Sequence, residues 1–276
     1  MTTIAALLAA ARRRIPASEA RLLLGHLLGR SHAWLEAHRD DPLDAEIAAQ
    51  MSALAARRAA GEPVAYLLGQ REFYGREFRV TPDVLIPRPE TELLVDIAKA
   101  KIGAGGTARV LDLGAGSGCL AVTLALELPR ARVTAVDVSP AALAVARGNA
   151  QRLGAQVAFV ESDWFAALPP QRFELIVANP PYVAAGDAHL RQGDLRFEPV
   201  DALTDHADGM TALRRIVAAA PAWLVDRGWL ACEHGHDQAA ALRQALGAAG
   251  LQNVEQWRDC AGIVRAGGGQ YCFSCE

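Results

Sequence analysis

The sequence predicts an α/β fold in which a doubly wound, mostly parallel sheet follows a small all-helical N-terminal domain. Beyond residue 108, apolar runs of strand length alternate with runs of helix length, as expected for parallel strands joined by crossover helices. Before residue 71 this alternation is missing, and apolar residues recur at helical spacing. With 276 residues, 51% of them hydrophobic, the chain is long enough for two domains.

The first domain is expected over residues 1–70, as a bundle of about four helices. Pro16 and Asp41-Pro42 interrupt the helical spacing, and Gly61-Glu62-Pro63 ends it. The spacing is carried by two runs of apolar residues, which are Ile4, Leu7, Leu8 and Ala11, then Ala20, Leu23, Leu24, Leu27 and Leu28.

A hairpin and linker over residues 71–88 are expected to join the two domains. Phe73 to Phe78 has the pattern of two short strands around a turn at Gly75. Residues 85–92, Leu-Ile-Pro-Arg-Pro-Glu-Thr-Glu, predict a rigid crossing into a helix that runs from about Pro89 to Ile102. Residues 89–276 then form the second domain.

The second domain is predicted to alternate strands with helices from end to end. A helix should follow the first strand through about Glu127, and Ser139-Pro140 should open the next with an N-cap and an N1 proline. Two further helices are predicted at residues 211–224 and 237–249. Strands are predicted at residues 109–113, 133–137, 157–161, 173–179 and 228–233, with closing strands near 253–259 and 270–274.

Three strand ends carry residues suited to a ligand, because ligands of open α/β sheets bind beyond the carboxyl ends of the strands. The first strand runs into Gly114-x-Gly116-x-Gly118, a turn that lets a ligand approach the backbone. Asp137 ends the second strand 19 positions after Gly118, close to the ~20 expected for a carboxylate that binds ribose hydroxyls. The third strand leads to Asp163-Trp164, where an adenine ring could rest on the indole.

The fourth strand ends at Asn179-Pro180-Pro181-Tyr182, a stiff corner because proline fixes φ and lacks an N–H. The Asn179 side-chain oxygen and the Pro180 carbonyl could each accept one hydrogen of a primary amide or exocyclic amine. The nitrogen would then be held with its lone pair facing an electrophile, so positioning would supply most of the rate gain. A turn that merely ends a strand remains the alternative, since short motifs have false matches.

Charge and cysteine usage narrow the class of protein. A net charge of −3 does not predict a nucleic-acid partner. Five scattered cysteines and the absence of a secretory signal or an apolar run of ~18 residues predict a cytoplasmic protein without a membrane span.

No metal site is expected, because His234-Gly235-His236 and the Cys272/Cys275 pair lack companions at ligand spacing. Cys119, at a helix start, is either a slightly acidified thiol or core filler.

The glycine turn reads GxGxG instead of the GxGxxG of dinucleotide-binding proteins, so NAD is disfavoured. Residues 110–118 resemble the first motif of class I S-adenosylmethionine-dependent methyltransferases. The resemblance implies a Rossmann-like methyltransferase sheet over residues 89–276, with S-adenosyl-L-methionine as cofactor and S-adenosyl-L-homocysteine as product. Carried over by position, it assigns the cofactor site to Gly114, Ala115, Gly116, Ser117, Gly118, Asp137, Trp164 and Asn179.

The helical domain, LIPRPETE at 85–92 and NPPY at 179–182 are together similar to the bacterial release-factor glutamine N5-methyltransferases of the HemK type. Phe197-Glu198-Pro199 and Asp208-Gly209 add spacing typical of that family. The resemblance implies methylation of the glutamine in the Gly-Gly-Gln motif of class 1 peptide chain release factors, with the helical domain recognising the substrate protein. It places the glutamine against Asn179, Pro180, Pro181 and Tyr182, with Asn179, Pro180 and Tyr182 as the catalytic group.

Two further roles follow from the resemblance. Asp112 lies near the methionine end of the cofactor and either offsets its ammonium charge or serves the strand end structurally. Phe73 or Tyr74 could join Tyr182 in walling the glutamine stem. Gly268-Gly269-Gln270 repeats the substrate tripeptide, and we interpret it as a coincidental lead-in to the last strand.

Alternatives remain open at this point. NPPY also serves N6-adenine methyltransferases acting on DNA or RNA, although these need basic surface to offset phosphate charge. A ribosomal-protein glutamine methyltransferase is a closer alternative. A non-catalytic protein that binds S-adenosylmethionine is a third, and the intact motifs disfavour it.

Overall fold

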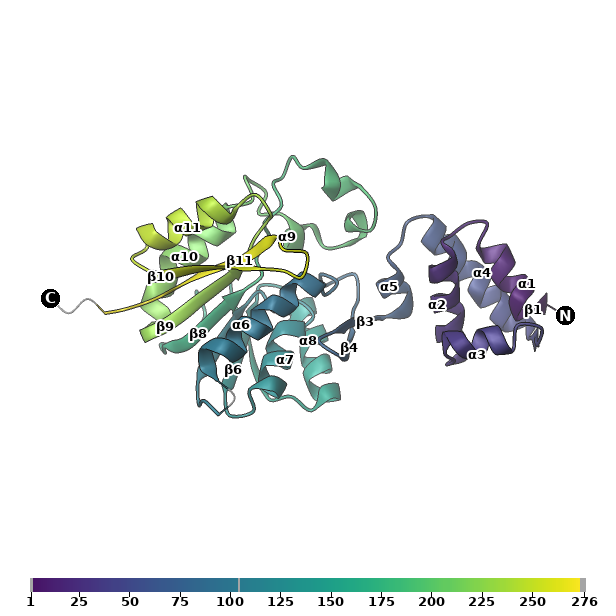
Figure 1. Cartoon of the computed structure of the whole chain (residues 1–276), viewed down its shortest axis with the longest axis horizontal. Helices are drawn as coiled ribbons and strands as arrows, with labels where there is room; N and C mark the ends of the chain where they lie inside the picture. The colour runs from purple at the N-terminus through teal and green to yellow at the C-terminus, as the bar shows by residue number, and fades with distance from the viewer. Residues whose placement is uncertain (1, 104, 274–276) are drawn as a thin grey trace. The chain divides into compact units, whose positions relative to one another are not determined.

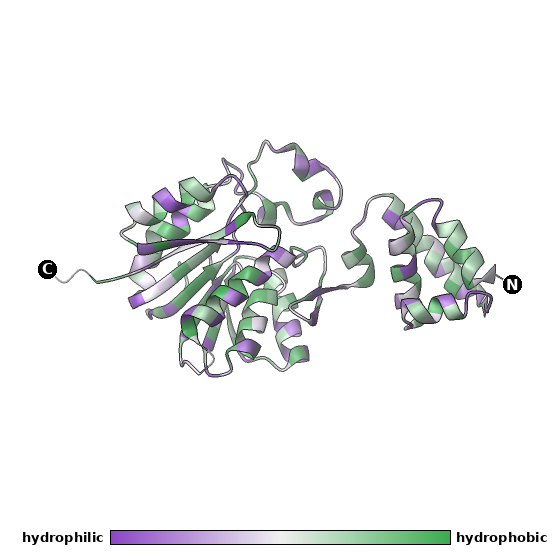
Figure 2. Ribbon diagram, viewed as in Figure 1, coloured by the Kyte–Doolittle hydropathy of each residue, from purple (hydrophilic) through white to green (hydrophobic). Residues whose placement is uncertain are grey.

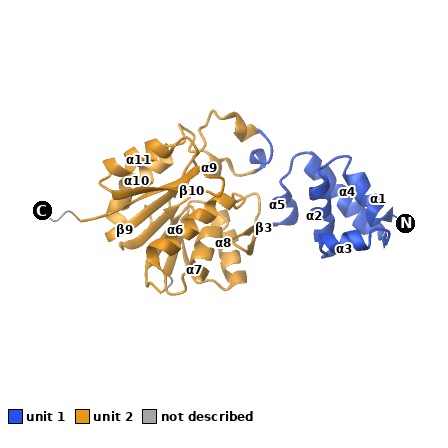
Figure 3. Ribbon diagram, in the orientation of Figure 1, with its two compact units in different colours: residues 1–70, 192–197 blue, residues 71–191, 198–276 orange. Residues whose placement is uncertain are grey.

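The computed structural model describes residues 2–103 and 105–273 (Figure 1). The chain divides into two compact units (Figure 3). Unit 1 comprises residues 1–70 and a short returning segment, 192–197. Unit 2 comprises residues 71–191 and 198–276.

Unit 1 is a helical bundle around its own apolar core. Its helices are α1 (Ile4–Ala11), α2 (Ala17–Leu28), α3 (His32–Ala37), α4 (Ala45–Ala59) and α5 (Val64–Leu68), with β1 (Thr2–Thr3) paired to β2 (Pro42–Leu43). The described part of the bundle thus has five helices where the sequence predicted about four. Ile4, Leu23 and Leu24 are fully buried in its core, as their helical spacing predicts.

The segment 192–197 is held on the bundle by charged side chains. The Arg58 guanidinium binds the Glu19 carboxylate through Nε and Nη2 at 2.8 and 3.0 Å. Its Nη1 donates to Asp194 Oδ1 at 2.7 Å. Arg196 donates to the carbonyl of Ala60. A segment far along the chain is therefore part of unit 1, which the sequence did not predict.

The hairpin is formed by β3 (Gln70–Phe73) and β4 (Arg76–Arg79), which pair in a sheet of their own. Tyr74 and Gly75 both have positive φ, 52° and 74°, as a type I′ turn requires. A 3-10 helix, η1 (Pro89–Thr91), then leads into α6 (Glu92–Ile102). The predicted helix from Pro89 to Ile102 is thus observed as a tight first turn followed by α-helix.

Unit 2 is built on one seven-stranded sheet with strand order β10-β11-β9-β8-β5-β6-β7. Neighbouring strands from β9 to β7 are parallel, whereas β11 runs antiparallel to both β9 and β10. The predicted doubly wound, mostly parallel α/β fold is confirmed. The strands are β5 (Arg109–Leu113), β6 (Arg132–Asp137), β7 (Val157–Glu161), β8 (Phe173–Ala178), β9 (Leu224–Glu233), β10 (Gln252–Arg258) and β11 (Val264–Gln270).

Helices cover both faces of this sheet, because successive side chains of a strand point to opposite faces. In β8, Leu175 and Val177 pack with α6, α7 (Cys119–Glu127) and α8 (Pro140–Leu153). Ile176 and Ala178 pack on the other face with α10 (Thr211–Trp223) and α11 (Ala239–Ala248). Figure 2 shows the resulting apolar character of the central strands. The remaining short helices are η2 (Ala188–Arg191), η3 (Leu195–Phe197) and α9 (Val200–Leu203).

The strand order reverses at β5, which has β6 on one side and β8 on the other. Loops after β5 and β8 therefore leave the sheet in different directions and open a crevice at the carboxyl ends of these strands. The glycine turn follows β5 and the Asn-Pro-Pro-Tyr corner follows β8. The topology thus places the two motifs together.

The last strand differs from the prediction. It spans Val264–Gln270, whereas the sequence predicted a strand near 270–274, of which residues 274–276 lie outside the described part of the chain. Gly268 and Gly269 lie inside this strand and pair with Ala231 and Leu230 of β9, so they are not a lead-in to it. A Cβ on Gly268 would lie 2.2 Å from the Leu230 carbonyl oxygen, so close packing, not β-propensity, explains this glycine-rich strand.

Candidate active site

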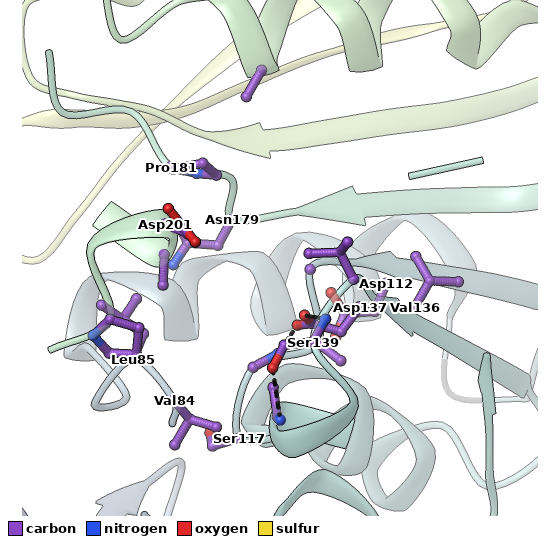
Figure 4. A pocket seen from close by; sticks show the side chains of 18 of the residues that line it. Val84, Leu85, Asp112, Ser117, Val136, Asp137, Ser139, Asn179, Pro181 and Asp201 are labelled. Atoms are coloured by element: carbon purple, nitrogen blue, oxygen red, sulfur yellow. Dashed lines mark hydrogen bonds between the residues drawn. The ribbon is translucent and has the colours of Figure 1, made fainter. Parts of the chain in front are cut away.

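A cavity of about 500 Å³ lies at the carboxyl ends of β5, β6 and β8, a size typical of pockets for small ligands. Its wall includes the glycine turn, the acidic end of β6 and residues 162–164. Figure 4 shows Asp112 and Asp137 on one side of the cavity and Asn179 and Pro181 on another. The cavity therefore joins the strand ends that the sequence singled out.

The glycine turn lets the backbone form part of the cavity wall. Gly114 has φ of +86°, a conformation that other residues rarely adopt. A Cβ there would lie 3.7 Å from the Trp164 ring and 3.9 Å from the Asn179 carbonyl oxygen. Gly118 lies outside the cavity wall and serves packing, because a Cβ there would lie 2.9 Å from Ala146 Cβ on α8.

Asp137 is fixed at the end of β6 by backbone donors. The N–H of Gly116 donates to its Oδ2 at 2.8 Å and the N–H of Ser139 donates to its Oδ1 at 2.9 Å. Each carboxylate oxygen has further lone pairs available to a ligand. Ser139 Oγ also accepts from Ala142 N at 3.2 Å, which confirms the predicted N-cap of α8.

Asp112 is the most unusual acid in the cavity wall. Its side chain, near the end of β5, is only 1% exposed, and neither carboxyl oxygen has a hydrogen-bond partner among the described residues. Burial raises its pKa to about 8 although the nearby Ala121 N–H opposes the rise, and the Asp137 charge adds to it. A buried carboxyl group without a partner is costly unless a cation or donor reaches it. The Asp112 carboxyl is therefore suited to accept from a cationic group of a ligand.

Trp164 lies in a strained turn after β7. Its φ is +54°, and Ser162 Oγ stabilises the turn by donating to the Trp164 carbonyl and accepting from Ala167 N, both at 2.9 Å. Neighbouring Asp163 binds the Arg215 guanidinium through both oxygens, at 2.9 and 2.7 Å. The indole is thereby held in the cavity wall next to an ion pair.

Asn179 follows β8, and its amide joins a buried hydrogen-bond chain. Asn179 Nδ2 donates to Thr91 Oγ1 at 3.0 Å, and Thr91 Oγ1 donates to Glu233 Oε2 at 2.7 Å. The Tyr182 hydroxyl donates to Glu233 Oε1 at 3.1 Å. Thr91 and Glu233 are 3% and 1% exposed. The Asn-Pro-Pro-Tyr corner is thus tied at both ends to one buried carboxyl group.

The chain of hydrogen bonds changes the acidity of its members. Burial raises the pKa of Glu233 to about 7, although the Thr91 and Tyr182 donors oppose the rise. Burial and the Glu233 carboxylate raise the pKa of the Tyr182 phenol, so this hydroxyl remains a donor at neutral pH.

Not every residue assigned by sequence reaches the cavity. Pro181 lies in its wall, whereas Pro180 and Tyr182 do not, because Pro180 is buried and the Tyr182 hydroxyl points to Glu233. Phe73 and Tyr74 also lie away from it: Phe73 packs edge-on against Phe78 in the core. The cavity wall does contain Gly114, Ala115, Gly116, Ser117, Asp137, Trp164, Asn179 and Pro181.

Cys119 lies in the cavity wall, and of its two interpretations the slightly acidified thiol is wrong. Burial raises its pKa to about 12, and the helix start does not offset this cost. Of the Cys272/Cys275 pair, Cys275 lies outside the described residues and Cys272 is a free thiol. Within residues 2–103 and 105–273, no group of three or more His, Cys, Asp and Glu side chains has metal-binding geometry.

Sequence reasoning missed three features of this site. The first two are Thr91 and Glu233, which touch although 142 positions separate them. The third is the contact that holds Arg88 of the linker in the cavity wall. Buried Glu198 binds the Arg88 guanidinium and also accepts from Ile86 N at 2.9 Å. The signal for Thr91 was present in LIPRPETE, a stretch interpreted as a rigid crossing and as a mark of the family, with no role given to Thr91. Glu233 ends a predicted strand, the position that drew attention to Asp137.

The doubly wound sheet, the glycine turn at its switch point and the acid that ends the next strand define a methyltransferase of the Rossmann-like class. Residues 89–194 match the family model described as the methyltransferase small domain. The chain belongs to the release factor glutamine methyltransferase family. Residues 1–69 match the model of the PrmC N-terminal domain.

Curated relatives carry the family assignment. A release factor glutamine methyltransferase of Bordetella pertussis is 58% identical over 92% of this chain and 95% of its own length. The Burkholderia pseudomallei relative of the same name is 55% identical over 93% of this chain and 92% of its own. The Escherichia coli relative is 42% identical over 93% and 92%.

Solved structures agree on the fold. A methyltransferase from Pyrococcus furiosus has a TM-score of 0.55 at 17% identity and covers 80% of this chain and 100% of its own. A T. thermophilus 16S rRNA N2 methyltransferase in complex with AdoMet and guanosine has a TM-score of 0.55 at 22% identity, over 73% of this chain and 49% of its own. At such identities the likeness concerns the fold alone.

No helix in the described residues is both long and apolar enough to cross a membrane.

Proposed function

We propose that this protein transfers a methyl group from S-adenosyl-L-methionine to the side-chain amide nitrogen, N5, of the glutamine in the Gly-Gly-Gln motif of class 1 peptide chain release factors. One observation carries the proposal: the Asn179 amide in the cavity wall has its NH₂ group engaged by Thr91, so the oxygen is the end of the amide that would accept from a substrate. The fixed amide oxygen suits an amide substrate, which has N–H groups to donate. The carboxylates on the opposite side of the cavity suit a cationic cofactor.

The residues present fit S-adenosylmethionine. The unpartnered Asp112 carboxyl would accept from its ammonium group, and Asp137 would accept from its ribose hydroxyls. The Trp164 ring would cover its adenine, and Gly114 admits it close to the backbone. When bound, this cofactor supplies an electrophilic methyl group. Gly116, Ala115 and Ser117 complete this side of the wall, and Gly118 supports it from behind.

The Asn-Pro-Pro-Tyr corner would hold the substrate amide. Asn179 Oδ1 and the Pro180 carbonyl would each accept one N–H of the glutamine, which directs the nitrogen lone pair away from both acceptors. Pro181 would wall the entry, and Tyr182 would keep the corner in place through Glu233. The chain therefore contributes orientation and exclusion of water, and no general base is required before attack.

The substrate is inferred from the family. The relatives are named for release factors, and the RNA-modifying neighbour shares only the fold. We propose that the helical domain, residues 1–70, recognises the body of the release factor, with residues 89–276 carrying the cofactor and residues 71–88 joining the two. A cytoplasmic location would follow from this substrate.

Mass spectrometry of a purified class 1 release factor after incubation with the enzyme and cofactor tests the function. We expect one added methyl group on the Gly-Gly-Gln glutamine. Transfer of labelled methyl to DNA, RNA or a ribosomal protein instead, with an unmodified release factor, would refute the proposal.

The role of the helical domain needs its own measurement. Hydrogen exchange on the full chain should show slower exchange in residues 2–70 when the intact factor binds. A short Gly-Gly-Gln peptide should leave that region unchanged and should have a higher KM. Equal KM values for factor and peptide would contradict recognition by this domain.

A further inference from the structure

We propose that Thr91 and Glu233 are positioning residues that set the orientation of the Asn179 side-chain amide. This inference rests on the proposed function, because it concerns how Asn179 meets the substrate amide. The three side chains come from different elements: Thr91 ends η1, Glu233 ends β9 and Asn179 follows β8. Their contacts form one chain, from Asn179 Nδ2 to Thr91 Oγ1 at 3.0 Å and on to Glu233 Oε2 at 2.7 Å.

The direction of this chain follows from the inventory of hydrogens. An ionised carboxylate only accepts, and a threonine hydroxyl has one hydrogen to donate. When Glu233 is ionised, Thr91 must therefore donate to it, which leaves the lone pairs of the Thr91 oxygen to accept from Asn179. The Asn179 NH₂ group is drawn to Thr91, and its Oδ1 is turned to the other side.

Orientation matters because the two ends of a carboxamide have the same shape and opposite polarity. With Oδ1 facing the cavity, Asn179 accepts an N–H of the glutamine amide. A flipped Asn179 would present its own NH₂ group to the substrate NH₂ group, and the two donors would repel. The corner alone does not choose between these states, whereas a buried acceptor behind it does.

The same carboxylate also holds the other end of the corner. Glu233 Oε1 accepts from the Tyr182 hydroxyl at 3.1 Å. Both ends of the Asn-Pro-Pro-Tyr turn are therefore hydrogen-bonded to the Glu233 carboxyl group, Tyr182 directly and Asn179 through Thr91. Glu233 and Thr91 are 1% and 3% exposed, which keeps water from substituting for either partner. The Glu233 carboxyl group thereby fixes both the position of the turn and the orientation of the Asn179 amide.

Kinetics of three variants and one matched control test the proposal. Thr91→Val keeps the shape and removes the hydroxyl, and Glu233→Gln offers Thr91 a donor that can reverse the chain. For each we expect kcat on the release factor to fall roughly 10-fold to 100-fold while cofactor affinity stays within about threefold. Thr91→Ser should restore most of the rate. Thr123→Val, at a fully buried threonine of α7, is the matched control and should leave kcat unchanged.

Nuclear magnetic resonance supplies a readout that needs no substrate. The Asn179 side-chain NH₂ signals, assigned by their loss in Asn179→Asp, should move and exchange faster with water in Thr91→Val. They should stay in place in Thr91→Ser and Thr123→Val. A merely structural role for Thr91 would not move these signals selectively.

The outcomes separate the two proposals. If wild-type enzyme fails to methylate the release factor, the proposed function fails, and the Asn179 signals still decide the orientation. If the wild type is active and Thr91→Val keeps full kcat or unchanged Asn179 signals, the positioning role is overturned.

Discussion

Asn179 Nδ2 lies 3.0 Å from Thr91 Oγ1, although 88 positions separate the two residues along the chain. Thr91 belongs to the short helix before α6, and Asn179 belongs to the corner after β8. The contact gives the Asn179 amide a defined polarity in the cavity wall. The Asn179 amide, which is the acceptor in the proposed function, thus has a hydrogen-bond partner outside the Asn-Pro-Pro-Tyr motif.

Asn179→Ala is expected to separate chemistry from cofactor binding. The alanine variant loses the oxygen that accepts the substrate N–H, so methyl transfer should fall roughly 100-fold to 1,000-fold. Cofactor affinity should stay within several-fold, since the Asp112 and Asp137 side of the cavity is untouched. Single-turnover kinetics and calorimetry measure the two quantities. Near-wild-type turnover would remove Asn179 from the catalytic group.

Cofactor binding at pH 7 should release close to one proton from Asp112. The pKa of this unpartnered carboxyl is about 8 in the free protein, so it is mostly protonated at pH 7. A bound ammonium group favours the ionised form and lowers the pKa. Titration calorimetry in buffers of different ionisation enthalpy measures the number of protons released when the cofactor binds.

Two variants control the proton count. Asp112→Asn should bind the cofactor more weakly and release no proton. Asp163→Asn removes an exposed acid of the same wall, already paired with Arg215, and should leave the count unchanged. A count near zero in the wild type would contradict the assignment of Asp112.

Stability of the cofactor-free protein should fall as pH rises, partly through Glu233. Its pKa is raised from 4.5 to about 7, so the folded state binds more protons than the unfolded state between those values. Stabilisation is therefore complete below pH 4.5 and is lost on the way to pH 7, by ~3 kcal/mol. Burial and Glu90 raise this pKa, while Thr91, Tyr182 and Arg265 lower it.

Urea denaturation at pH 5 and pH 8 measures the difference. Glu233→Gln cannot ionise, so its stability should depend less on pH than that of the wild type. Asp112, whose pKa is raised in the same direction, should account for much of the slope that remains. Identical slopes in wild type and variant would show that Glu233 does not titrate in this window.

Gly118→Ala should cost more stability than Gly116→Ala. Both positions have positive φ, +78° and +51°, and share the strain of placing alanine there. Only at Gly118 would the new Cβ meet another atom closely, 2.9 Å from Ala146 Cβ. Overpacking of this kind costs ~1–3 kcal/mol beyond the strain. Equal losses in urea denaturation would contradict the packing role of Gly118.

Local chemistry was enough to predict most of the second domain. The strand at 109–113, the end of a strand at Asp137 and the helix opened by Ser139-Pro140 are observed as expected. Each depends on neighbours within a few residues: apolar runs, a cap, or a proline that stops a strand. The last strand was misplaced because its glycines have little strand propensity, and only the close approach of the Leu230 carbonyl explains them.

The sequence by itself determined the fold class, the glycine turn and the corner at Asn179, because these features depend on residue types and on short spacings along the chain. Only the tertiary structure decided how the site is completed. Thr91 and Glu233 meet across 142 positions, and Asp112 is buried near the end of β5 without a hydrogen-bond partner among the described residues. The physical reason is that burial and hydrogen-bond direction depend on what surrounds a side chain in space, which spacing along the chain does not specify.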